Sequence, residues 1–142
     1  MNPQALARVV DYWQTLTPES VEAIATIYTD GAYFRDPFNE VHGLPAIRHI
    51  FTDMFVRLIE PRFTIVETIA EGDNATLIWD FEFRIRGFQP DRLRRIHGLT
   101  HLRFALDGRV DYHRDYWDAA GELYETFPVI GAVLRWLKKR AA

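Results

Sequence analysis

The hydrophobic pattern of this chain changes its period once, and that change narrows the folds it can adopt. Up to Pro61, apolar residues recur mainly at helical spacing, most clearly in a stripe between Ile47 and Leu58. After it the period becomes two, and between Leu77 and Arg86 apolar and charged residues alternate. Helices followed by a meander of long strands predict an α+β fold, not a parallel sheet with helical crossovers.

The same patterns place the individual elements. We expect a first helix over residues 5–16, a second between Pro18 and Gly31, and a third from Pro45 until Pro61 breaks it. The stretch from Pro37 to Gly43 is expected to be a loop. Strands are expected over residues 32–36, 63–70, 77–86, 93–106 and 109–118, and two tail helices over residues 119–126 and 128–140.

Composition limits the functions open to the chain. Its 142 residues, 48% of them hydrophobic, suffice for a single domain over residues 1–142, with 119–142 as a helical C-terminal extension. The absence of cysteine excludes thiol catalysis, thiolate metal sites and disulfides, and a net charge of −3 gives no field that would recruit nucleic acid. Because the N-terminus lacks a signal-peptide pattern and no apolar run reaches the ~18 residues of a spanning helix, we expect a cytoplasmic protein.

Several short strings, taken with the element order, resemble the nuclear transport factor 2-like superfamily, and within it the ketosteroid isomerases and the SnoaL-like polyketide cyclases. The strings are Tyr28–Ala32, Phe34–Pro37, His42–Arg48, His101–Phe104, Asp107–Val110 and His113–Asp118. The resemblance implies a cystatin-like cone, in which N-terminal helices pack on a strongly curved antiparallel sheet around one apolar pocket. It also implies a homodimer formed through the outer sheet face. Enzymes and simple binders share this fold, so the resemblance leaves the reaction open.

Three candidate site residues follow from the likeness to the isomerases. By resemblance Asp36, just before Pro37 at a strand end, is the general base, and Tyr12 is a donor to the substrate oxyanion. Thr100 stands where these enzymes have a second donor, an aspartic acid, and its neutral hydroxyl stabilises developing charge less well. The residues themselves allow plainer roles, with Asp36 capping the loop that follows it and Tyr12 bonded to a core group.

His113, Asp115 and Trp117 alternate along the last expected strand and therefore project from one face. The resemblance puts that face on the pocket, whereas a surface position or an ion pair with an arginine of the last two strands is the alternative. If Asp115 shares the pocket with Asp36, one carboxylate can act as base. The other, protonated, can then donate a hydrogen bond in place of the missing aspartic acid.

These residues predict acid–base proton transfer next to a carbonyl on a small apolar organic molecule. Asp36 would remove the proton, and Tyr12, with Thr100 or Asp115, would stabilise the enolate. The expected substrate-binding walls are Phe34, Phe38, Phe51, Phe55, Trp79, Phe81 and Trp117. No cofactor and no metal are expected, because the sequence holds no nucleotide motif and no convincing set of metal ligands. A hydrolase with an aspartate-activated water, and a non-catalytic binding or interaction domain, are the alternatives.

The tail combines an apolar face with a basic end. The apolar residues of its predicted helix are Val129, Ile130, Val133, Leu134, Trp136 and Leu137. Lys138, Lys139 and Arg140 follow at the C-terminus, where cations suit the helix dipole. We expect this face to pack over the sheet, over the mouth of the cone or against a partner subunit, and we expect no membrane association.

Overall fold

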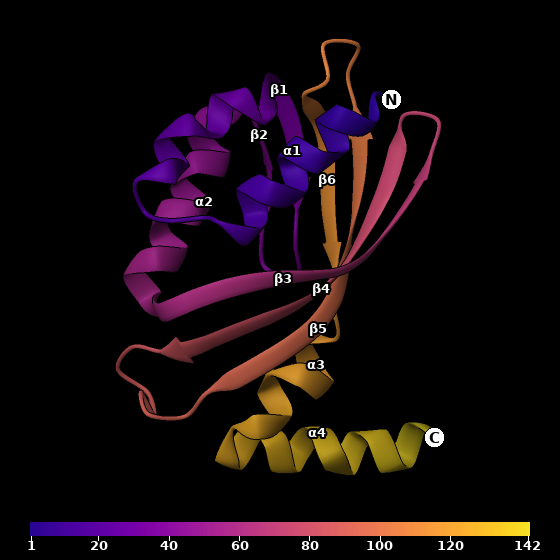
Figure 1. Cartoon of the computed structure of the whole chain (residues 1–142). Helices are drawn as coiled ribbons and strands as arrows, with labels where there is room; N and C mark the ends of the chain where they lie inside the picture. Colours follow the sequence, from indigo (N-terminus) through magenta and orange to yellow (C-terminus); the bar gives the residue numbers. More distant parts are fainter.

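The structure is a computed structural model that describes residues 1–124 and 126–142. Its elements in chain order are α1 (Pro3–Gln14), the 3₁₀ helix η1 (Ser20–Thr26), β1 (Tyr28–Arg35), β2 (Glu40–His42), α2 (Leu44–Arg57), β3 (Leu58–Glu71), β4 (Asn74–Ile85), β5 (Arg94–Phe104), β6 (Val110–Tyr116), α3 (Ala119–Glu122), the 3₁₀ helix η2 (Tyr124–Thr126) and α4 (Pro128–Ala141). Helices α1 and α2 lie on one face of a curved sheet, and the predicted α+β fold is confirmed (Figure 1).

The six strands form one sheet in the order β2-β1-β6-β5-β4-β3. Neighbouring strands are antiparallel except β1 and β6, which run parallel and bring the start of the chain beside its last strand. Residues alternate between buried and less buried along β4 and β5, as the period of two predicts. The buried residues of these two strands therefore form the inner face, toward the helices.

Several boundaries differ from the sequence prediction, and the stretch from Pro37 to Gly43, expected to be a loop, contains the short strand β2. The second expected helix is only the 3₁₀ turn η1, because Tyr28 already belongs to β1, where it pairs with Val110 of β6. Helix α2 ends at Arg57, and Pro61 lies inside β3 instead of ending the helix. The β3–β4 register shifts between Ile59 and Arg62, and a bulge tolerates a residue without an N–H in a strand.

Helix α1 faces the sheet through Ala5, Val9 and Trp13, which are spaced by four residues and are all buried. The Trp13 ring contacts the ring of Phe51 from α2, with centroids 4.7 Å apart, and that of Phe63 from β3, 5.8 Å away. Trp13 thus joins the two long helices to the inner face of the sheet.

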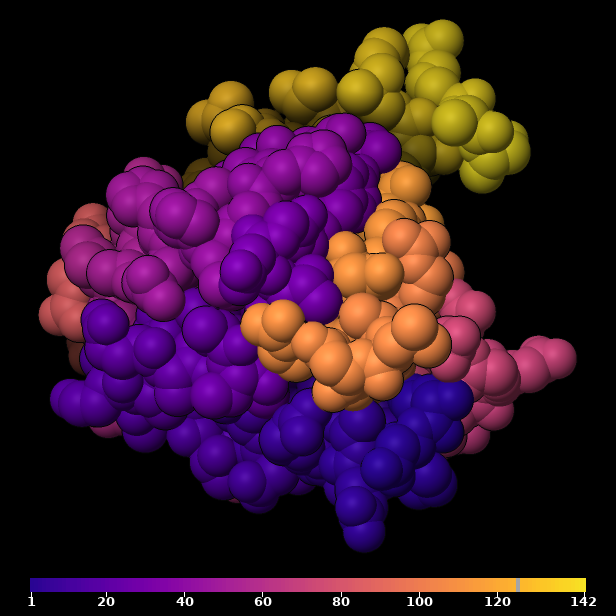
Figure 2. Space-filling view, turned by 90° about the horizontal axis from the view of Figure 1, so that it is seen from above, coloured from indigo at the N-terminus to yellow at the C-terminus, as the bar shows by residue number. Residues whose placement is uncertain are grey.

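The tail packs differently from the sequence expectation. Helix α4 lies near the end of the sheet, away from α1 and α2, and stands out from the body in Figure 2, where it is yellow. Its one buried residue among those described is Gly131, and apolar side chains of the helix such as Val129 and Trp136 remain 76% and 55% exposed. The expected packing of this face over the sheet or the cone mouth is therefore not found within the chain. No helix in the described part of the chain is long and apolar enough to cross a membrane.

Candidate active site

A cavity of about 520 Å³ lies on the inner side of the sheet, between α2 and strands β3 to β6. Its lining is Phe34, Asp36, Phe38, Asn39, Ile50, Phe51, Asp53, Met54, Arg57, Leu58, Phe63, Trp79, Phe81, Ile96, Asp115 and Trp117. Of the seven predicted wall residues, Phe55 alone is missing from this lining; it packs against the core instead.

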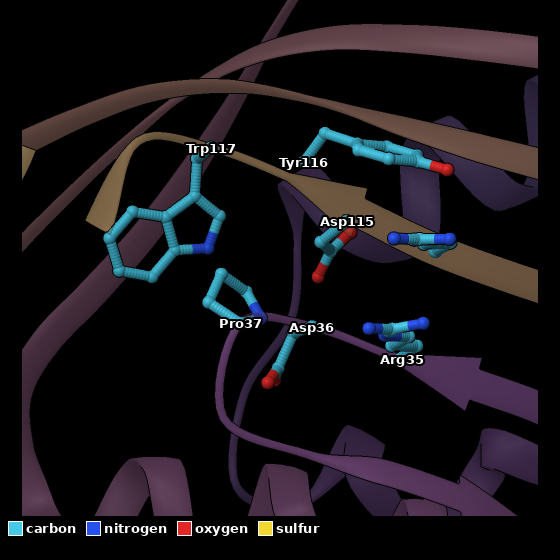
Figure 3. Close-up of a pocket in the computed structure, with 7 residues that line it drawn as sticks. Arg35, Asp36, Pro37, Asp115, Tyr116 and Trp117 are labelled. Atoms are coloured by element: carbon cyan, nitrogen blue, oxygen red, sulfur yellow. The ribbon is translucent and has the colours of Figure 1, made fainter. Parts of the chain in front are cut away.

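Two further hollows adjoin this cavity, so the expectation of one pocket is too simple. A recess of about 20 Å³ shares Phe51, Phe63, Trp79 and Asp115 with it. An open groove of about 510 Å³ runs beside the ends of β1 and β6. Figure 3 shows this groove, with the carboxyl groups of Asp36 and Asp115 turned toward the side of Pro37 and Trp117.

Asp36 and Asp115 are brought together by the parallel pairing of β1 with β6. Arg35 and Arg114 are paired positions of these strands, so the residues that follow them lie side by side. Both aspartates line the main cavity, and the expectation that they would share it is met in the structure. They differ in what holds them.

Asp36 is held by the loop that it begins. Its Oδ1 accepts hydrogen bonds from the backbone N–H groups of Phe38 and Asn39, both at 2.7 Å, and the Asn39 side-chain amide lies 3.1 Å from each carboxyl oxygen. This is the loop cap that the sequence allowed as the plainer role. Both carboxyl oxygens of Asp36 are therefore occupied by donors of its own loop.

Asp115 is held by side chains of the neighbouring strand and of its own. Its Oδ1 accepts from the Thr100 hydroxyl at 2.5 Å and lies 2.7 Å from His113 Nε2. Thr100 in turn accepts a hydrogen bond of 2.8 Å from Trp79 Nε1. Among the described residues nothing donates to the second oxygen, Oδ2. Asp115 therefore lines the cavity with one oxygen fixed and one available.

The far end of this network is Tyr28, whose hydroxyl lies 2.7 Å from His113 Nδ1. Tyr28 is fully buried; burial above all, and then the Asp115 carboxylate, raise the pKa of Tyr28 well above its usual value. A phenol that stays protonated donates to Nδ1, so the neutral imidazole carries its proton on Nε2 and donates it to Asp115. His113 has 5% of its side chain exposed and both ring nitrogens engaged, so it orients Asp115 and does not reach the cavity itself.

Tyr12 does not join the other candidates. Its hydroxyl donates to the carbonyl oxygen of Ser20 at 2.9 Å, and burial raises the pKa of Tyr12 to about 12, with Arg48 opposing this rise. Tyr12 lines neither the cavity nor the recess; its neighbour Trp13 lines the recess. The prediction that Tyr12 points into the pocket is wrong, because successive helical residues point about 100° apart and Trp13 takes the sheet-facing position.

The arginines considered as ion-pair partners for Asp115 make other contacts, and Arg114 lies over the ring of Tyr116, 4.5 Å from its centroid. Arg95 binds Asp80 and Arg103 binds Asp111, both pairs lying on the outer side of the sheet.

Gly98 of β5 packs closely against the aromatic wall of the cavity, since a Cβ there would come 2.6 Å from the Trp79 ring. Among the described residues, no group of three or more histidine, aspartate or glutamate side chains could hold a metal ion.

The family comparison agrees with this geometry. A SnoaL-like domain family matches residues 9–113, well over half of the sequence. The chain belongs to that family. The superfamily resemblance expected from the sequence is thereby confirmed. A search of curated proteins gave no match.

Solved structures give the fold of this SnoaL-like protein. A hypothetical protein with a ketosteroid isomerase-like fold from Catenulispora acidiphila, in complex with trimethylamine, is 17% identical, with 87% of this chain and 92% of that chain covered and a TM-score of 0.72. A protein assigned as a SnoaL-like polyketide cyclase from Shewanella putrefaciens is 23% identical, covering 87% and 98%, with a TM-score of 0.70. An LEH-like epoxide hydrolase from M. tuberculosis is 16% identical, covering 84% of each chain, with a TM-score of 0.66. Such likeness extends to the fold alone.

Proposed function

We propose that this SnoaL-like protein is an enzyme that moves a proton next to a carbonyl group on a small hydrophobic substrate. The observation that carries the proposal is the Asp115 carboxylate, which lines an aromatic cavity with Oδ1 held by Thr100 and His113 and Oδ2 without a donor among the described residues. A positioned carboxylate in an apolar site is suited to general base catalysis.

In this mechanism Asp115 Oδ2 removes a proton from the carbon beside the carbonyl. The electron pair of the broken C–H bond forms a C=C bond, and the carbonyl electrons move to oxygen as an enolate. The neutral carboxyl group then returns the proton to the same or another carbon. Thr100 and His113 keep the carboxylate oriented through both steps, and the apolar walls exclude water.

The base is thus assigned to Asp115 and not to Asp36, which the sequence favoured. Asp36 already accepts hydrogen bonds from Phe38 and Asn39 in its own loop. We propose that it shapes the mouth of the cavity beside Phe38, which contacts the rings of Trp117 and Tyr124.

The experiment is deuterium exchange from heavy water into a set of enones and β-diketones, followed by NMR. Replacement of Asp115 by Asn should lower the exchange rate about 10²–10⁴-fold, the usual contribution of a general base. Asp36→Asn should keep most of the rate, because an amide oxygen can still accept from the loop. Asp111→Asn, which alters an exposed carboxylate on the outer face, is the matched control.

Three outcomes contradict the proposal. Loss of exchange in Asp36→Asn with retention in Asp115→Asn would reverse the assignment of the base. Equal rates in all variants would remove the chemistry from both carboxylates. Binding of the carbonyl compounds without any exchange would indicate the non-catalytic binding protein that the sequence also allowed.

Hydrolysis by an Asp115-activated water is the second candidate. The recess beside Asp115 has the volume of about one water molecule, and the epoxide hydrolase compared above shares this fold. Incubation with epoxides in ¹⁸O-labelled water would reveal this activity as label in a diol product.

A further inference from the structure

One polar group at the site has no role in the mechanism so far. The indole Nε1–H of Trp13 is buried and has no hydrogen-bond partner among the described residues. An indole N–H can only donate, and nearly all buried donors in folded proteins are paired. An acceptor from outside the chain would satisfy it.

The recess shows where such an acceptor would lie. Trp13 lines it together with Thr100, His113 and Asp115, and the Trp13 and His113 rings are 5.8 Å apart. Its volume of about 20 Å³ is close to that of a single water molecule and therefore suits one oxygen atom. Because the recess shares lining residues with the main cavity, an oxygen carried by a substrate in that cavity can enter it.

The other donors that line the recess are already engaged. Trp79 Nε1 donates to Thr100, the Thr100 hydroxyl donates to Asp115, and His113 donates to Asp115. Within the described part of the chain, Trp13 is the one donor of this group left for a ligand.

We propose that Trp13 Nε1–H donates a hydrogen bond to the substrate oxygen that becomes negative when Asp115 removes the neighbouring proton. This inference rests on the proposed function. A donor placed at developing negative charge lowers the barrier of proton abstraction. Trp13 then takes the role of oxyanion donor that the sequence gave to Tyr12. The expected substrates are compounds whose carbonyl oxygen can accept this hydrogen bond.

The first test observes the indole protons directly and needs no turnover. The four tryptophans give four indole signals in a ¹H–¹⁵N spectrum, and Trp13→Phe identifies the signal of Trp13. Titration with 4-nitrophenolate, whose charged oxygen mimics an enolate, should move the Trp13 signal downfield. The methyl ether 4-nitroanisole, which has no bare charged oxygen, should leave it in place.

The second test compares neighbouring residues of the same helix. Trp13→Phe keeps an aromatic ring but removes the N–H, so it should lower affinity for 4-nitrophenolate at least tenfold and lower kcat of exchange about 10–100-fold, with little change in KM. Tyr12→Phe, which removes a hydroxyl bonded to Ser20, should change neither quantity.

The outcomes separate the two proposals. A phenolate that moves another indole signal, or none, would overturn the role of Trp13. Retention of phenolate affinity in Trp13→Phe would do the same. Should the Trp13 signal respond while wild-type protein exchanges no deuterium, the donor stands and the proposed reaction falls. If Trp13→Phe fails to fold, the four wild-type signals still decide, because Trp79→Phe, Trp117→Phe and Trp136→Phe assign the other three.

Discussion

Two aspartate–histidine pairs lie on opposite faces of the same sheet. Asp115 lies 2.7 Å from His113 on the inner face, and Asp80 lies 2.8 Å from His97 on the outer face. The two carboxylates are almost equally covered, with 19% and 15% of the side chain exposed. The exposed fraction alone therefore does not distinguish the proposed base, Asp115, from Asp80 on the outer face.

The two carboxylates, Asp115 and Asp80, differ in the residues that they bind. His113 is 5% exposed and bonded to a buried phenol, whereas His97 is 60% exposed, and Arg95 binds Asp80 directly. Hydrogen bonds from His97 and then from Arg95 lower the pKa of Asp80. A cation neutralises the outer carboxylate. Asp115 instead accepts hydrogen bonds from Thr100 and His113, and its Oδ2 has no donor among the described residues.

Replacing either histidine by alanine should give the largest difference in stability between the two faces of the sheet. His113→Ala leaves the Tyr28 hydroxyl without a partner, removes one of the two donors to Asp115 and opens a cavity, so it should lower the free energy of unfolding by about 2–4 kcal/mol. His97→Ala, at an exposed site, should change it by less than about 0.5 kcal/mol. Urea unfolding of both variants checks this, and equal losses would show that the faces are not different.

Replacement of Tyr28 should have an intermediate effect. Tyr28→Phe leaves His113 Nδ1 without its donor and should cost about 1–2 kcal/mol. The raised pKa of Tyr28 stabilises the fold fully below about pH 10, and this contribution is lost as the pH rises further. Wild-type stability should thus fall more steeply above pH 10 than that of the variant. Parallel alkaline profiles in urea would contradict the assignment.

The smallest effect is expected for Asp80→Asn. Because the folded pKa of Asp80 lies below its usual value, the carboxylate stabilises the fold above about pH 3.8 and this stabilisation disappears as the pH falls. The melting temperature of the variant should therefore depend less on pH between about 2 and 5 than that of wild type. It should lie slightly below the wild-type value at pH 7, and the difference should vanish at the acid end. Deuterium exchange by the variant should be unchanged.

Hydrophobic periodicity and short sequence strings predicted those features of the fold that are set by neighbouring residues in the sequence. Alternation along β4 and β5 identified the inner face, and the string around Asp36 and the alternation through Asp115 placed both carboxylates at the cavity. The pairing of β1 with β6 joins residues far apart in the sequence, and for that reason Tyr28 was assigned to a helix face and its bond to His113 was missed.

The choice between Tyr12 and Trp13 shows a second limit. Both residues fit an apolar stripe on α1, and the resemblance gave the role of donor to Tyr12. The stripe Ala5–Val9–Trp13 decides the buried side once the sheet is present. The spacing of four residues from Ala5 to Val9 and from Val9 to Trp13 is visible in the sequence, and it identifies Trp13 as the buried residue.

The lack of a side chain at Gly98 limits how the shape of the cavity can change. A methyl group there would displace the indole of Trp79, and with it the N–H that anchors Thr100 beneath Asp115. The cavity wall beside Gly98 therefore cannot be enlarged without disturbing the hydrogen bonds that hold Asp115. New substrate shapes should instead be accommodated from the α2 side, where Ile50 and Met54 line the cavity and can be exchanged for larger or smaller residues without touching the hydrogen-bonded network.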